Sequence, residues 1–172
     1  MIILVTGGSA SGKSEYAEER LIALAGKNPK YYIATMKIEK AAAARIERHR
    51  HLRAGKGFIT IEEDSCLLNV LTSLPDDRGE ASCIIEDIPN LLANRMFSDA
   101  GTADENAIIS DIRQLGSICQ NLVIVTGDIF CDGVDYDEVT SSYIAALGRL
   151  NILAAKMADE VIRVVAGIPC HF

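Results

Sequence analysis

The chain has 172 residues, a length that suits one domain spanning 1–172, and 49% of its residues are hydrophobic, which excludes an intrinsically disordered protein. Its net charge of −7 disfavours binding to nucleic acid or an anionic membrane. No apolar stretch reaches the ~20 residues of a membrane span, and the N-terminal run is too short for a signal peptide. Five scattered cysteines without C-x-x-C spacing exclude a disulfide framework and a zinc site, and indicate a reducing cytoplasm.

Apolar runs alternate with segments of helical period along the whole chain. Strands are predicted at 1–5, 30–34, 57–61, 82–86, 121–126 and 160–166, and helices at 13–25, 38–53, 65–73, 103–118 and 138–157. Several of the strands are continuous apolar runs, typical of a parallel sheet covered on both faces. We therefore expect a single α/β domain with a mostly parallel sheet and helices on both faces. In such sheets, ligands bind beyond the carboxyl ends of the strands.

The first predicted strand leads into the octet that constrains function most. Gly7-Gly8-Ser9-Ala10-Ser11-Gly12-Lys13-Ser14 fits the phosphate-loop pattern G-x-x-x-x-G-K-[ST] and stands between a buried strand and an amphipathic helix. Its backbone N–H groups can converge on phosphate oxygens, and the positive end of the helix adds to that field. Lys13 is expected to bridge the β- and γ-phosphates, and Ser14 to ligate Mg²⁺. An ordinary Gly/Ser-rich turn would not need a Lys-Ser pair at this register.

A basic segment follows the second predicted strand. Residues 37–56 hold seven Lys or Arg against two Glu, a net charge of +5. Arg45, His49 and Arg53 fall at i, i+4 and i+8, on one face of the predicted helix. The neighbouring positive charge favours an uncharged, nucleophilic imidazole, which suits a histidine that attacks an α-phosphate and forms a covalent nucleotidyl intermediate. The alternative is a solvated basic face.

Acidic residues follow two later strands. Glu86-Asp87 ends the strand predicted at 82–86, where one carboxylate can hold Mg²⁺ opposite the loop serine or accept a proton from a substrate hydroxyl. The alternative is an acidic turn that caps a helix after Pro89. The loop from Thr126-Gly127-Asp128 to Cys131-Asp132-Gly133 can support magnesium or substrate, or can consist of ordinary turn residues.

These segments resemble the bifunctional adenosylcobinamide kinase/adenosylcobinamide-phosphate guanylyltransferase family of cobalamin biosynthesis. The likeness covers nearly the whole chain, and its most specific piece is Arg45-Ile46-Glu47-Arg48-His49-Arg50. It implies a P-loop NTPase (RecA-like) fold and a homotrimer. It also implies Mg²⁺-dependent phosphorylation of the corrinoid's aminopropanol hydroxyl with ATP or GTP, followed by transfer of GMP from GTP through an enzyme histidine.

The resemblance also assigns residues. His49 matches the guanylylated histidine and is expected to be catalytic together with Lys13. The expected metal ligands are Ser14, Glu86 and Asp87. The expected nucleotide-binding residues are Gly7, Gly8, Ser9, Ala10, Ser11, Gly12, Lys13, Ser14, Ile33, Ala34, Thr35, Arg50, His51, Leu52, Arg53, Glu62 and Glu86.

Three positions depart from the family pattern. Ala10 stands where the family usually carries Arg, and Gly127-Asp128 stand where it carries Asn-Glu. A lost charge-assisted hydrogen bond is typically worth ~1.5–3 kcal/mol, so weaker nucleotide binding is expected. Two alternative functions therefore stay open: a plain small-molecule kinase, and a paralogue that binds nucleotide without turnover and has a regulatory or interaction role.

Overall fold

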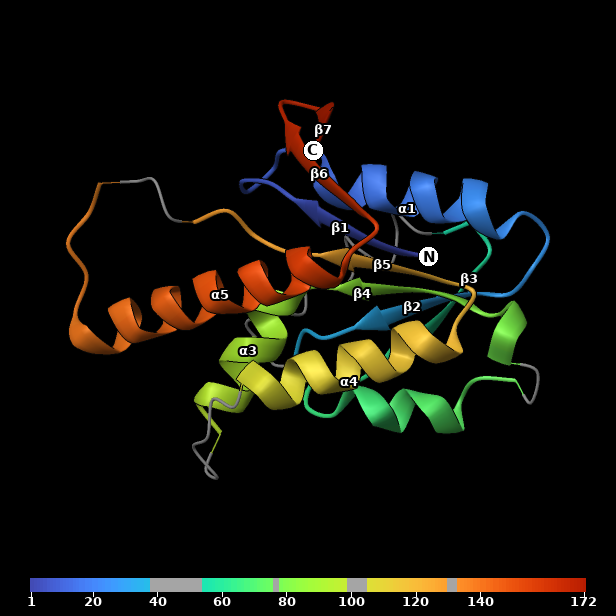
Figure 1. Ribbon diagram of the computed structural model, residues 1–172, viewed down its shortest axis with the longest axis horizontal. Coiled ribbons are helices and arrows are strands. Elements are labelled where there is room, and N and C mark those ends of the chain that lie inside the picture. Colours follow the sequence, from blue (N-terminus) through green and yellow to red (C-terminus); the bar gives the residue numbers. More distant parts are fainter. Residues whose placement is uncertain (38–53, 76–77, 99–104, 130–132) are drawn as a thin grey trace.

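The computed structural model of the protein (Figure 1) describes residues 1–37, 54–75, 78–98, 105–129 and 133–172. The helix predicted at 38–53 lies outside the described residues. So do five predicted site residues, namely His49, Arg50, His51, Leu52 and Arg53.

A mainly parallel sheet forms the centre of the molecule. Its strands are β1 (Ile2–Thr6), β2 (Lys30–Ala34), β3 (Phe58–Glu62), β4 (Ser82–Glu86), β5 (Asn121–Val125), β6 (Glu160–Val165) and β7 (Ile168–His171). They lie in the order β3-β2-β4-β5-β1-β6-β7, and all pairs are parallel except β6 with β7. The predicted mostly parallel sheet is confirmed, and its six predicted strands match β1 to β6 within one residue at each end.

Helices cover both faces of the sheet, as predicted. Helix α1 (Lys13–Ala25) lies on one face, while α3 (Ile88–Met96), α4 (Glu105–Ile118) and α5 (Glu138–Met157) lie on the other (Figure 1). Two short 3₁₀ helices, η1 (Leu67–Thr72) and η2 (Arg78–Glu80), precede β4. None of the helices in the described ranges has the length and apolar character that crossing a bilayer requires.

Alternation of strand side chains divides the core into two parts. On β4, Ile84 packs with the α1 side, whereas Cys83 and Ile85 pack with the side that carries the other helices. Successive residues of a strand point to opposite faces. Because both faces are buried, nearly every residue of the central strands must be apolar, and this explains the unbroken apolar runs in the sequence.

Four elements differ from the predicted ones. The helix predicted at 65–73 is the 3₁₀ helix η1, and η2, α3 and β7 were not among the predicted elements, although the capping alternative for Glu86-Asp87 included a helix after Pro89. β7 follows a tight turn in which Ala166 and Gly167 both have positive φ, at 51° and 80°. Such a turn joins antiparallel strands, and the edge position of β7 tolerates Pro169 because one edge of that strand needs no partner.

Candidate functional site

The octet after β1 packs tightly against the turn between β6 and β7. A Cβ on Gly7 would lie 2.6 Å from the carbonyl oxygen of Val164, so no larger residue fits there. Gly12 enters α1 with a φ of 89°, which favours glycine. The Gly167 amide donates to the Ser11 carbonyl over 2.8 Å. The loop therefore contacts β6 and the turn after it, and the structure requires glycine at position 7 for packing and favours it at position 12 for the backbone conformation.

Lys13 and Ser14 open α1 at the carboxyl edge of the sheet. The Lys13 Nζ donates to the Gly8 carbonyl over 3.2 Å, so its ammonium lies across the loop. The Ser14 Oγ donates to Glu86 Oε1 over 2.6 Å. The structure thus brings together the lysine, the serine and the strand-end acid that the sequence singled out.

Glu86 ends β4 in an environment that disfavours a bare negative charge. Its Oε2 is buried and has no hydrogen-bond partner among the described residues. Burial, followed by the charge of Asp87, raises the pKa of Glu86 to about 7, although the Ser14 hydrogen bond and Lys13 oppose this. A cation placed beside this oxygen would neutralise the carboxylate and satisfy the unpartnered atom.

The donor chemistry of this pair fits Mg²⁺. A hydroxyl and a carboxylate are hard oxygen ligands, and Mg²⁺ in kinases is typically bound by few protein groups and completed by waters and substrate phosphates. In the described ranges no three His, Cys, Asp or Glu side chains form a cluster that could hold a metal by themselves. Ser14 and Glu86 could supply two of the oxygen ligands of Mg²⁺.

Asp87 takes the helix-capping position that the sequence left open as an alternative. Its side chain accepts from the Asn90 amide over 2.9 Å and caps α3. Its backbone is tied to Thr35, whose hydroxyl accepts from the Asp87 amide and donates to the Asp87 carbonyl. Asp87 therefore lies beside Glu86, and at least one of its carboxylate oxygens is used in capping α3.

The ends of β2 and β3 continue the site on the far side of β4. Ala34 is in register with Glu86 on β4 and with Glu62 on β3. Ile33 and Thr35 are fully buried, whereas Ala34 is half-buried and Glu62 is exposed. Of the predicted nucleotide-binding residues in this segment, Ala34 and Glu62 are the side chains that reach the surface.

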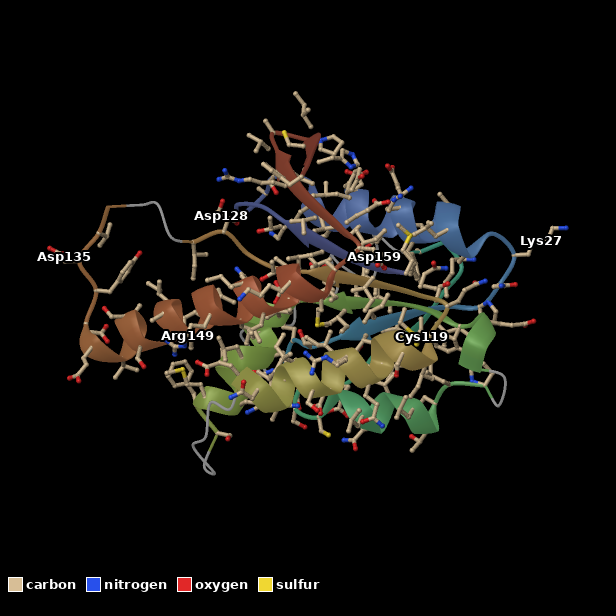
Figure 2. The ribbon with its side chains drawn as sticks, viewed as in Figure 1. Lys27, Cys119, Asp128, Asp135, Arg149 and Asp159 are labelled. Carbon is tan, nitrogen blue, oxygen red and sulfur yellow. The ribbon has the colours of Figure 1, made fainter. Side chains whose placement is uncertain are left out.

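On the other side of the loop, the structure reveals an arginine that the sequence reasoning missed. Asp128, left open above and labelled in Figure 2, forms an ion pair with Arg163 of β6. The two residues line a cavity of about 650 Å³ with residues 8–11, Ile129 and residues 164–166. Residues near the end of β6 alternate between buried and exposed, so an arginine at an exposed position of this strand does not indicate a function. Arg163 lies beside the phosphate loop because β6 pairs with β1.

Gly127 and Asp128 are held by the end of β5. Thr126 Oγ1 donates to Asn151 Oδ1 over 2.6 Å, and Asn151 Nδ2 donates to the Gly127 carbonyl over 3.2 Å. The Asp128 amide donates to the Gly7 carbonyl over 3.1 Å. The loop after β5 is thus attached both to α5 and to the octet.

Sequence comparison matches the chain to one family over almost its full length. The family model described as "Cobinamide kinase / cobinamide phosphate guanyltransferase" matches residues 3–172. The "Bifunctional adenosylcobalamin biosynthesis protein CobU" of Salmonella typhimurium is 35% identical over 98% of this chain and 97% of its own length. The protein of the same name from Escherichia coli is 33% identical over the same shares.

Solved structures share the fold at much lower identity. One solved ATPase domain has a TM-score of 0.53 at 13% identity and covers 94% of this chain and 68% of its own. A prototypical ATPase from the type III secretion system of pathogenic bacteria has a TM-score of 0.58 at 10% identity, with 99% and 56% covered. These similarities confirm the predicted P-loop NTPase fold.

Proposed function

The chain belongs to the cobinamide kinase / cobinamide phosphate guanyltransferase family, and we propose that it performs both reactions of that name on a corrinoid. It phosphorylates the aminopropanol hydroxyl of adenosylcobinamide and then transfers GMP from GTP to the resulting phosphate. The observation that carries the proposal is the Ser14–Glu86 hydrogen bond beside Lys13, in a chain that matches the family over 3–172.

In the kinase step, the γ-phosphoryl group of ATP or GTP moves to the corrinoid hydroxyl. The bond between the γ-phosphorus and the β,γ-bridging oxygen breaks, the hydroxyl oxygen forms the new bond, and its proton is released. Backbone N–H groups of residues 7–14 hold the phosphates, and Lys13 neutralises charge on the β- and γ-oxygens. Ser14 and Glu86 would hold Mg²⁺, with the negative charge of Asp87 beside them, and the metal would supply positive charge to the triphosphate.

In the guanylyl transfer step, His49 is the proposed nucleophile. Its imidazole attacks the α-phosphorus of GTP, pyrophosphate leaves, and the phosphate of the corrinoid later takes the GMP group from the histidine. Basic side chains around His49 neutralise the transition-state charge. Residues 50–53, residues 33–35 and Glu62 contribute to binding this GTP.

The test of the two-step activity is protein labelling. GTP labelled at the α-phosphate should leave acid-labile, alkali-stable label on the wild-type protein and none on His49→Ala. His171→Ala is the matched control, because His171 is exposed on β7, and it should label as the wild type does. Label retained by His49→Ala would refute the assignment of the nucleophile.

Two further outcomes separate the alternatives. Phosphorylation of cobinamide without any protein label would identify a plain kinase. Binding of GTP measured by calorimetry, without label and without phosphorylation, would identify a nucleotide-binding paralogue. The positions that motivate these alternatives are Ala10, Gly127 and Asp128.

We further propose a homotrimer that works in the cytoplasm. The four cysteines among the described residues are all free thiols, as a reducing compartment would keep them. Analytical ultracentrifugation should give three times the chain mass of 18.6 kDa. A monomer at micromolar concentration would contradict this assembly.

A further inference from the structure

The cavity beside the phosphate loop lies at the ends of β5, β1 and β6, and is displaced from Glu86 toward β6. In the sheet, β5 separates β4 from β1, and β6 follows on the other flank of β1. The Ser14–Glu86 pair marks the end of the loop where metal and γ-phosphate belong. A triphosphate anchored there and lying along the loop toward β6 would bring its nucleoside to this cavity.

The walls of the cavity combine apolar, charged and backbone groups. Ile129 and Val165 are 39% and 50% exposed, which is high for side chains of this type. The Asp128 carboxylate and Arg163 guanidinium pair at one wall. Ser11 lines the cavity from the loop, and its buried Oγ has no hydrogen-bond partner among the described residues.

We propose that this cavity binds the ribose and base of the phosphoryl donor in the kinase step, an assignment that rests on the proposed kinase activity. Its volume of about 650 Å³ lies in the range of sites that take ligands of this size. Ile129 and Val165 contact the base, and Arg163 lies against its π-face. Asp128 accepts hydrogen bonds from the ribose hydroxyls, and Arg163 keeps its carboxylate ionised and oriented.

The proposal separates two nucleosides in space. The GTP of guanylyl transfer is proposed to use residues 33–35 and Glu62, at the ends of β2 and β3. The phosphoryl donor instead extends toward the ends of β5 and β6, on the other side of β4 in the sheet order. One phosphate loop thus serves two nucleotides whose bases lie on opposite sides of it.

Isothermal titration calorimetry with three probes in the presence of Mg²⁺ tests the site. The probes are ADP, 2′,3′-dideoxy-ADP and inorganic pyrophosphate. The wild type should bind ADP about tenfold more tightly than the dideoxy form, since the ribose hydroxyls donate to a charged acceptor. Asp128→Ala should bind both nucleotides equally, at the weaker level, and should bind pyrophosphate as the wild type does.

Glu105→Ala is the matched control, because Glu105 forms a comparable ion pair with Arg149 away from the cavity. It should keep the tenfold preference. Val165→Glu is a second variant, which places a charge on the half-exposed apolar wall of the cavity. It should weaken the binding of ADP at least tenfold without weakening the binding of pyrophosphate. The proposal is overturned if Asp128→Ala keeps the wild-type preference for ADP, or if Val165→Glu keeps wild-type ADP affinity.

The phosphate loop itself is tested by Lys13→Ala, which should weaken ADP and pyrophosphate alike. Loss of binding in Lys13→Ala with no change of preference in Asp128→Ala would overturn the nucleoside site and leave the proposed kinase standing. If Lys13→Ala bound both probes as the wild type does, this would contradict phosphate binding by residues 7–14 and, with it, the proposed kinase activity.

Discussion

The two sides of the phosphate loop carry one acid each, in contrasting environments. Glu86 ends the central strand β4, with one oxygen 2.6 Å from Ser14 and the other buried without a hydrogen-bond partner among the described residues. Asp128 pairs instead with Arg163, whose side chain is 49% exposed, at a wall of the cavity. The β4 side therefore disfavours a carboxylate whose charge is not neutralised, whereas the β6 side leaves a paired acid beside open space, as the proposed nucleoside site requires.

The largest expected effect is the loss of catalysis at the buried acid. Glu86→Gln keeps the shape of the side chain but removes the negative charge that Mg²⁺ needs, so the kinase kcat should fall by ~10²–10³-fold. Steady-state kinetics with cobinamide and ATP measure this. Glu105→Gln, which alters an acid paired with Arg149 away from the loop, is the control. A Glu86→Gln enzyme within threefold of wild type would show that Glu86 is not the metal ligand.

The second prediction uses the pH dependence of stability without metal. The pKa of Glu86 is about 7 in the folded protein against 4.5 as its ordinary value, so the native state keeps a proton that the unfolded state has lost. The stabilisation from this group is therefore fully present below pH 4.5 and is lost as pH rises through 7. The loss amounts to about 3 kcal/mol.

Urea denaturation of the wild type and Glu86→Gln from pH 4 to 8 isolates this contribution. The free energy of unfolding of the wild type should decrease relative to that of the variant between pH 4.5 and 7, because the amide does not titrate. Parallel curves for the two proteins over this range would mean that Glu86 titrates normally. Added Mg²⁺ should favour the ionised form and lower the midpoint of the difference.

A third, smaller effect separates Glu86, which ends β4, from Asp87, which caps α3. Asp87→Asn keeps a side chain that caps helices well but removes its charge, so stability should stay within ~0.5 kcal/mol while the kinase kcat falls up to about tenfold. Asp87→Ala also removes the cap on α3 and should cost about 1 kcal/mol of unfolding free energy. Equal kcat values for Asp87→Asn and wild type would limit Asp87 to capping.

The smallest expected effect is on stability at the β6 side. Removing one partner of an exposed ion pair typically costs less than ~1 kcal/mol, so the unfolding free energy of Arg163→Ala should lie within that margin of the wild type. Thermal or urea denaturation measures this. A loss above about 2 kcal/mol would show that the ion pair supports the fold rather than the cavity, and would remove the contrast with Glu86.

Much of the fold was predictable because the buried strands can be recognised from their local sequence. The apolar runs of β1, β4 and β5 exist because both faces of the sheet are covered, and such runs are visible without any tertiary information. The short helix α3 escaped the list of elements, since nine residues carry too little periodicity. β7 escaped because an exposed edge strand needs no apolar run.

The candidate phosphate loop and the acid opposite it could be predicted from local sequence. The octet around Lys13 and Ser14 follows from backbone requirements that only glycines and small residues meet, and Glu86 follows from its place at the end of a buried strand. The strands that flank β1, which are β5 and β6, became known only from the fold. The cavity is lined by residues that are distant along the chain, namely residues 8–11, Asp128 and Arg163. They come together because of the strand order, which local residue preferences do not encode.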